Sequence, residues 1–211
     1  MMYMVDQNCF GAFQREIVEM HRLRYRVFKE RLNWDVTVSG DMEIDEYDAL
    51  KPIYLLYCND DDRVEGCVRF LPTIGPTMLR DSFPALLGTH PPPNDPRIWE
   101  SSRFSLDIDP LSQRTDRGTS RATYELLAGM GEFGLMHGLT HIVTVTDIFV
   151  ERIVRRAGVP WRRIHDPQRI GNSLAVAGFA EISEWIVDEL CALGDLRRPV
   201  ITAPTRLKET A

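Results

Sequence analysis

Arg24 is a charged residue in a segment whose other inward-facing positions are apolar. Residues 13–32 carry apolar side chains at a helical period: Phe13, Ile17, Met20, Val27 and Phe28. On the same predicted helix Arg24 points into this apolar stripe. A guanidinium stays charged at any working pH, so one that faces a core needs an anionic partner or ligand. Arg24 therefore extends past the edge of the stripe, forms a buried structural ion pair, or binds a ligand.

An acidic segment follows this helix. Residues 40–50 contain five acids and no base: Asp41, Glu43, Asp45, Glu46 and Asp48. Two aromatic residues, Phe28 and Trp34, lie just upstream, and ring faces beside carboxylates attract organic cations. A calcium loop is excluded because Glu46 stands where an EF-hand needs glycine. The segment indicates a site for an organic cation, with a solvated acidic loop as the alternative.

A third polar group lies in residues 99–104, WESSRF. Strict strand alternation places Glu100 and Ser102 on one face and Arg103 on the other. A single site containing all three therefore requires a β-bulge or a strand end that turns one of them. Arg69 adds a cation in another predicted strand, where a cross-strand ion pair is the alternative.

The second half of the chain contains a basic segment. Residues 151–169 hold two acids, Glu151 and Asp166, against six arginines: Arg152, Arg155, Arg156, Arg162, Arg163 and Arg169. In a chain of net charge −6 this local excess is informative,. It suits phosphates or an acidic protein partner. An ordinary solvated helix face is the alternative.

The periodic segments that position these groups alternate between helix and strand. Helices are expected at 13–32, 120–137, 149–157 and 182–193, and strands at 52–58, 64–71, 98–106, 141–146, 161–164 and 173–179. Residues 35–50 are expected to form a loop, 72–97 an irregular connection around a short helix, and the tail after Arg198 an extended segment. This order predicts an α/β (or α+β) fold, a single three-layer domain over residues 1–211 with a mixed central sheet.

Composition excludes several classes of function. The negative net charge gives no support to nucleic-acid binding, and no apolar run approaches the ~20 residues of a membrane span. Four cysteines without CxxC spacing favour reduced thiols and a cytoplasmic location,. His137 and His141 are four residues apart, but the helix is expected to end at Gly138, so no metal site is expected.

Together these positions resemble the LuxI-type acyl-homoserine-lactone synthases. The resemblance rests on the strings RYRVFKERLNWDV, DEYD, VRFLPT and ESSRF, with a weaker match at RAG, 156–158. The signature positions are Arg24, Phe28, Trp34, Asp45, Asp48, Arg69, Glu100 and Arg103, and Phe83 also falls at a position the family usually fills with Phe.

The resemblance implies a fold similar to the GNAT N-acyltransferases, with a central sheet split to admit an acyl thioester. It implies synthesis of a quorum-sensing signal from S-adenosylmethionine (SAM), a substrate and not a cofactor, and an acyl donor on acyl carrier protein or coenzyme A. Residues up to about 105 would form the SAM site and catalytic strand, and the remainder the acyl-donor site. The SAM-binding residues would be Arg24, Phe28, Trp34, Asp45, Asp48, Arg69, Phe83 and Arg103.

The resemblance implies two steps, N-acylation of the SAM α-amine and then lactonisation that releases methylthioadenosine. The site residues can supply the chemistry of the first step. Either Arg24 or Arg103 would pair with the SAM carboxylate. Glu100 would be the general base that frees the α-amine, and Ser102 or backbone N–H groups would stabilise the oxyanion. By the same resemblance Thr144 falls where a hydroxyl favours a 3-oxo chain. From the basic segment, Arg152, Arg155 and Arg156 would hold the donor. A monomer is expected.

Two other functions are compatible with the same residues. One is a GNAT-type N-acyltransferase with another amine acceptor, which would keep the basic donor site without binding SAM. The other is a non-catalytic binding module of the same fold. Binding of SAM distinguishes the first from a synthase, and turnover distinguishes the second.

Overall fold

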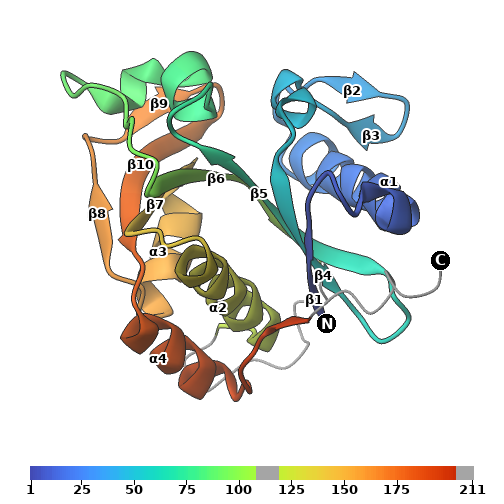
Figure 1. The fold of residues 1–211 in the computed structure, drawn as a ribbon. Coiled ribbons are helices and arrows are strands. Elements are labelled where there is room, and N and C mark those ends of the chain that lie inside the picture. The colour runs from blue at the N-terminus through green and yellow to red at the C-terminus, as the bar shows by residue number, and fades with distance from the viewer. Residues whose placement is uncertain (108–118, 203–211) are drawn as a thin grey trace.

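A mixed nine-stranded sheet forms the centre of the computed structural model, which describes residues 1–107 and 119–202. The strand order is β11-β1-β4-β5-β6-β7-β10-β8, with β9 also paired to β10 (Figure 1). The strands are β1 (Met2–Val5), β4 (Ile53–Cys58), β5 (Val64–Pro72), β6 (Ile98–Leu106), β7 (His141–Asp147), β8 (Trp161–Arg163), β9 (Gln168–Ile170), β10 (Ser173–Glu181) and β11 (Ile201–Thr202). Only the β1–β11 and β6–β7 pairs are parallel within the described ranges.

Helices cover both faces of the sheet. On one side lies α1 (Gln14–Arg24), and on the other lie α2 (Arg121–Met136), α3 (Ile148–Arg156) and α4 (Glu184–Gly194) (Figure 1). Neighbouring strand residues point to opposite faces: Leu55 packs in the core beneath α2 and α4, and Leu56 packs in the core beneath α1. The expected single three-layer α/β domain with a mixed sheet is confirmed.

The sheet splits between β6 and β7. These strands pair only from Ile98 to Ser101 on β6 and from His141 to Thr144 on β7. Both strands continue beyond this ladder, β6 to Leu106 and β7 to Asp147, without further pairing to each other. The backbone edges of β6 and β7 therefore separate just after Ser101, the neighbour of Glu100, which is the residue predicted to be the base.

The first predicted helix is confirmed with one change of geometry. It is α-helical to Arg24 and continues as a π-helical segment, Tyr25–Arg31. A short 3-10 helix, Phe10–Phe13, precedes it. The other three helices and six strands are also present, and most of their ends agree with the sequence-based ranges to within two residues.

Several short elements were absent from the sequence-based prediction. They are β1, β9 and the hairpin of β2 (Val38–Ser39) and β3 (Met42–Glu43) in the expected acidic loop, whereas β11 lies in the tail that was expected to be extended. The acidic loop also contains a 3-10 helix, Glu46–Leu50. The irregular connection contains two short helices, Met78–Ser82 and Pro84–Leu87, where one short helix was expected. These elements are two to five residues long, too short for a periodic pattern to be recognised.

Within the described residues no helix is long and apolar enough to cross a membrane. All four cysteines are free and buried.

Candidate active site

Arg24 is the last residue of α1 and its side chain is fully buried. Its Nε donates to the Glu43 carboxylate, and its two terminal nitrogens donate to the two Asp48 oxygens over 2.8 and 2.9 Å. The helix becomes π-helical at the next residue, a distortion that is frequent at functional sites,. Of the three alternatives for Arg24, extension past the helix edge is wrong, because acids enclose the guanidinium.

Arg69 on β5 is equally buried. Its terminal nitrogens donate to both oxygens of Asp45, and one of them also donates to Asp48 over 2.8 Å. Its Nε donates to the Ser102 hydroxyl over 3.1 Å. Arg69 therefore forms its ion pairs with the acidic segment, and the expected alternative of a cross-strand ion pair is wrong.

A β-bulge turns Arg103 towards these groups. Two residues of β6, Arg103 and Phe104, stand opposite a single residue of β5, Val68. Arg103 has a φ of +56°, in the left-handed region that non-glycine residues seldom occupy,. Such a bulge re-aims a side chain within a strand. The bulge that a shared site for Glu100, Ser102 and Arg103 required is confirmed.

The turned Arg103 side chain completes an ion-pair cluster. It donates to Glu43 over 2.8 and 3.1 Å and lies 2.7 Å from an Asp45 oxygen. Its guanidinium also lies over the Phe28 ring, 5.3 Å from the centroid. Arg103 retains 10% exposure of its side chain, whereas those of Arg24 and Arg69 have none.

The three arginines face three carboxylates, so the cluster is balanced in charge. We call this set the arginine–carboxylate cluster; it comprises Arg24, Arg69, Arg103, Glu43, Asp45 and Asp48. Burial opposes ionisation of Asp48, but hydrogen bonds and charge from Arg24, with the charge of Arg69, hold the pKa of Asp48 well below its ordinary value. Asp48 is therefore an anion at any working pH.

Glu100 lies beside this cluster with 1% of its surface exposed. Its two carboxylate oxygens accept hydrogen bonds from the backbone N–H groups of Met78 and Leu79 over 2.8 and 2.7 Å. Burial raises the pKa of Glu100 to about 7, although those two N–H groups and Arg69 act in the opposite direction. A carboxylate that titrates near neutrality is suited to general acid–base chemistry.

Aromatic side chains cover the outer side of the cluster. Phe28 and Trp34 stack with their centroids 5.3 Å apart. The Trp34 indole N–H donates to the Ser173 hydroxyl on β10 over 3.0 Å, which joins the segment after the first helix to the strand beyond the split. Phe83 packs with Tyr47 and Met78 next to the segment that binds Glu100.

The predicted acyl-side residue Thr144 ends the β6–β7 ladder. Its hydroxyl donates to the Ser101 carbonyl over 2.8 Å. Thr144 therefore lies directly opposite Ser101, the residue between Glu100 and Ser102, at the point where the two strands separate.

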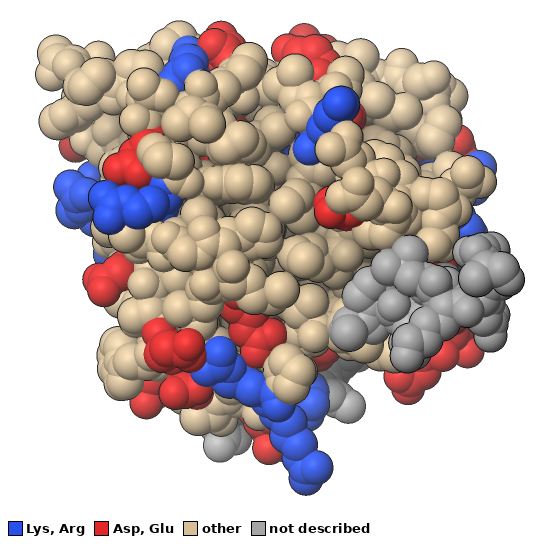
Figure 2. All heavy atoms as spheres, in the orientation of Figure 1, with Lys and Arg blue, Asp and Glu red and all other residues tan. Residues whose placement is uncertain are grey.

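The predicted donor-side arginines lie apart from the cluster, on α3. The carboxylate of the buried Glu151 on α3 pairs with Arg163 on β8 and with Arg155 on α3. Hydrogen bonds from these two arginines lower the pKa of Glu151. Arg152 lies over the Phe149 ring, 5.8 Å from its centroid. Figure 2 shows further basic side chains at the edge of the molecule formed by β8, the strand of Arg162 and Arg163. Arg156 is exposed at the end of α3.

Sequence reasoning missed two residues that organise the site. Glu43 was counted among the acids but not assigned a role, yet it is fully buried and binds both Arg24 and Arg103. The Nδ1 of His21 lies 2.9 Å from the Glu43 carbonyl, and burial with the Arg24 charge lowers the pKa of His21. Only the signal at His21 was readable, since His21 precedes Arg24 by three residues on one helix face, whereas Glu43 has the same alternate spacing as the exposed Asp41,.

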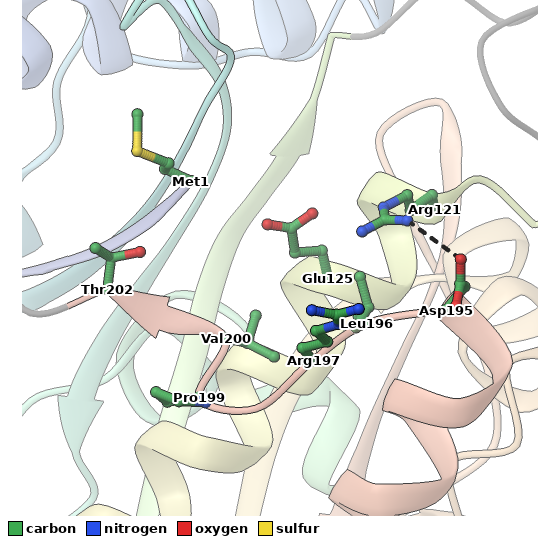
Figure 3. Close-up of a pocket in the computed structure, with 9 residues that line it drawn as sticks. All are labelled: Met1, Arg121, Glu125, Asp195, Leu196, Arg197, Pro199, Val200 and Thr202. Atoms are coloured by element: carbon green, nitrogen blue, oxygen red, sulfur yellow. Dashed lines mark ion pairs between the residues drawn. The ribbon is translucent and has the colours of Figure 1, made fainter.

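A cavity of about 470 Å³ lies elsewhere in the molecule (Figure 3). It is lined by Met1, Arg121, Glu125, Asp195, Leu196, Arg197, Pro199, Val200 and Thr202. None of the predicted site residues lines it. Within the described residues no group of three or more His, Cys, Asp or Glu side chains is arranged to hold a metal ion.

The sheet splits between β6 and β7, and the buried Glu100, whose carboxyl has a pKa of about 7, lies beside the split, an arrangement suited to acyl transfer,. The family model for autoinducer synthases matches residues 11–190. An acyl-homoserine-lactone synthase of Agrobacterium fabrum (strain C58 / ATCC 33970) is 41% identical over 190 residues, which cover 90% of each chain. The crystal structure of the AHL synthase LasI superposes with a TM-score of 0.79 at 38% identity, covering 91% of this chain and 94% of LasI. This chain belongs to the autoinducer synthase family, the acyl-homoserine-lactone synthases, and is an acyltransferase.

More distant structures agree on the fold alone. The acyl-homoserine lactone synthase BjaI, in a complex with SAM and isopentyl-CoA, matches with a TM-score of 0.84 at 24% identity, covering 96% of this chain and 92% of BjaI. A Lactobacillus plantarum protein described as an N-acetyltransferase matches with a TM-score of 0.54 at 15% identity, covering 86% and 99% of the two chains. The GNAT-like architecture implied by the sequence is confirmed.

Proposed function

We propose that this chain makes an N-acyl-L-homoserine lactone from SAM and an acyl thioester and releases methylthioadenosine. One observation carries the proposal: Glu100, with a pKa near 7, stands between the arginine–carboxylate cluster and the split of the sheet. The cluster side, residues up to about 105, would bind SAM. The rest of the chain, across the split, would bind the acyl donor.

Arg103 is the arginine that pairs with the SAM carboxylate. Arg24 and Arg69 have no exposed side-chain surface and are enclosed by acids, so they hold Glu43, Asp45 and Asp48 in place. Arg103 is the cluster arginine with accessible surface, and a guanidinium binds a carboxylate bidentately,.

Phe28 and Trp34 suit the sulfonium of SAM. Their stacked rings lie beside Arg103, and aromatic faces attract organic cations,. Phe83 packs against Met78 on the Glu100 side and would close the site there. Asp45, next to Arg103, suits the α-ammonium group.

N-acylation begins when Glu100 takes a proton from the α-ammonium group, directly or through a bound water. The amine nitrogen then attacks the thioester carbonyl carbon, the C–S bond breaks, and the thiol leaves with a proton. Ser102, whose hydroxyl accepts from Arg69, or backbone N–H groups on the β6 edge beyond Ser101 would stabilise the oxyanion,. These N–H groups do not pair with β7, because the ladder between the strands has ended.

Lactonisation forms the second bond. A carboxylate oxygen of the methionyl part attacks its own γ-carbon, and the sulfonium sulfur leaves as neutral methylthioadenosine with the electron pair of the C–S bond. The leaving group already carries the positive charge, so alignment of the reacting atoms is the main requirement. Neither step is a redox reaction, so the reaction as proposed uses no cofactor.

An acyl carrier protein fits the donor side better than coenzyme A. Phe149, Arg152, Ile153 and Arg156 recur at a helical spacing on α3, and Phe149 is 66% exposed,. An exposed stripe of apolar and cationic side chains suits an acidic protein surface. Arg155, paired with Glu151, flanks this stripe. We propose that one monomer of the synthase binds the carrier protein here.

SAM binding tests the proposal against a GNAT-type acyltransferase with another amine acceptor. SAM at 100 times its Kd should stabilise the protein by about 2.7 kcal/mol, visible as a rise in Tm. Arg103→Lys should weaken this effect at least about tenfold in Kd, because lysine does not form the bidentate pair. Arg15→Lys, on the exposed face of α1, is the matched control. An absence of any SAM effect would favour the other acceptor.

A further inference from the structure

Trp161 on β8 carries a buried polar group without a partner. Its indole N–H makes no hydrogen bond in the structure, although the residue is only 8% exposed. Burying such a donor unpaired costs free energy, so each case needs an explanation. Among the described residues the other buried side-chain atoms without partners are Arg80 Nε and the Tyr124 hydroxyl. Arg80 still donates to two backbone carbonyls through its terminal nitrogen.

The Trp161 ring lies over β10 at Gly178. A Cβ added to Gly178 would stand 2.6 Å from Cε2 and Cζ2 of the indole, so only glycine leaves room for the ring there. Cε2 is the ring atom bonded to the nitrogen that bears the unpaired hydrogen. The indole N–H is therefore next to Gly178.

Gly178 places the indole beside Thr144. The two residues are directly opposite each other in the β7–β10 ladder. Directly opposite residues of an antiparallel pair direct their side chains to the same face. Thr144 and the ring over Gly178 therefore share a face, next to the position where β6 and β7 separate.

The hydroxyl of Thr144 is already used as a donor. Its single proton is donated to the Ser101 carbonyl, a contact that fixes the end of the β6–β7 ladder. An oxygen on a bound acyl chain is an acceptor and needs a donor. On this strip of the face, the indole N–H of Trp161 is the donor that the described residues leave unpaired.

We propose that Trp161 is a specificity-determining residue whose indole N–H binds an oxygen on the acyl chain, an oxo or hydroxyl group near the thioester. This inference rests on the proposed function. An acyl chain without this oxygen would leave the indole N–H of Trp161 unpaired when it is bound. A site with an unpaired polar group discriminates against the ligand that lacks the matching hydrogen-bonding group.

The test compares acyl-carrier-protein donors of equal length, with a 3-oxo group, a 3-hydroxyl group or neither. Wild-type protein should prefer the oxygenated chains in kcat/KM. Trp161→Phe retains an aromatic ring but removes the N–H, and should reduce this preference about tenfold, the effect of one hydrogen bond. The unsubstituted donor should react at least as well as with wild type, since the unpaired group has gone.

Two controls separate this role from packing. Trp185→Phe alters a tryptophan that is 64% exposed, and Tyr124→Phe removes the other unpaired buried hydrogen-bonding group of an aromatic side chain; neither should change the preference. An unchanged preference in Trp161→Phe, or an equal loss with all three donors, would overturn the inference. Failure of wild-type protein to form a lactone from any donor would instead contradict the proposed function.

Discussion

Replacing Glu100 by glutamine should change how stability depends on pH. Burial raises the pKa of the folded-state carboxyl from its ordinary value of 4.5 to about 7. Below about pH 4.5 the group is protonated in both folded and unfolded chains. Between 4.5 and 7 the folded protein keeps the proton that the unfolded chain has lost, so the free energy of unfolding falls as pH rises. Above about pH 7 Glu100 is ionised in both the folded and the unfolded chain, and the free energy of unfolding stays at its lowered value,.

The size of this effect follows from the two pKa values. Each pH unit of difference corresponds to about 1.4 kcal/mol, so raising the pH from 4.5 to 8 should cost the wild-type protein about 3 kcal/mol through Glu100. Glu100→Gln carries no charge at any pH and avoids this loss. The glutamine amide has a single acceptor oxygen for the two N–H groups of Met78 and Leu79, so one of these buried donors loses its partner. This lowers the stability of the variant by about 1–3 kcal/mol at every pH.

The assay is urea or thermal unfolding of both proteins at pH 5, 6, 7 and 8. The variant should be the less stable protein at pH 5 and should gain about 3 kcal/mol relative to wild type by pH 8, equivalent to about 10 °C in Tm. Other titrating groups are common to both proteins and cancel in the comparison. A stability difference that stays constant across this range would refute the account of Glu100.

Three other outcomes are expected. Asp48→Asn should destabilise the protein by about 3–5 kcal/mol in urea unfolding, because it leaves two buried arginines short of an anion,. The control Asp41→Asn, at an exposed pair with Arg22, should cost less than about 1 kcal/mol,. Equal losses of stability in the two variants would contradict the buried cluster. Trp34→Phe and Ser173→Ala remove the same hydrogen bond, so a double-mutant cycle should show a coupling of about 1 kcal/mol, and additive effects would exclude that contact. The kcat/KM should rise with unit slope up to about pH 7 and then level as Glu100 ionises, and a profile without that limb would exclude Glu100 as the base,.

The parts of the fold with strong periodicity could be predicted from the sequence. The strand at 98–106 matches β6, and the helix at 120–137 matches α2 with Ser120 as its N-cap. Strand β1 could not be predicted, because MYMV is only four residues long and is buried on both faces, which removes the alternation that marks a strand,.

Parts of the site depended on information that is not local in sequence. The polar residues of β6 showed that a bulge was needed, but its position at Arg103 depends on the pairing with β5. Which acids turn inward was also hidden, since Glu43 and Asp41 look alike in a list of carboxylates, yet Glu43 is buried and Asp41 is exposed. The role proposed for Trp161 became visible only when β8, β10 and β7 were placed side by side.

Mass spectrometry of complete reactions tests the central claim most directly. Purified protein would be incubated with SAM and a panel of acyl-carrier-protein and acyl-coenzyme-A thioesters. The account predicts an acyl-homoserine lactone and methylthioadenosine in equal amounts, with the carrier-protein donors preferred and both products lost in Glu100→Gln. No lactone from any thioester, or undiminished lactone from the Glu100→Gln protein, would contradict it.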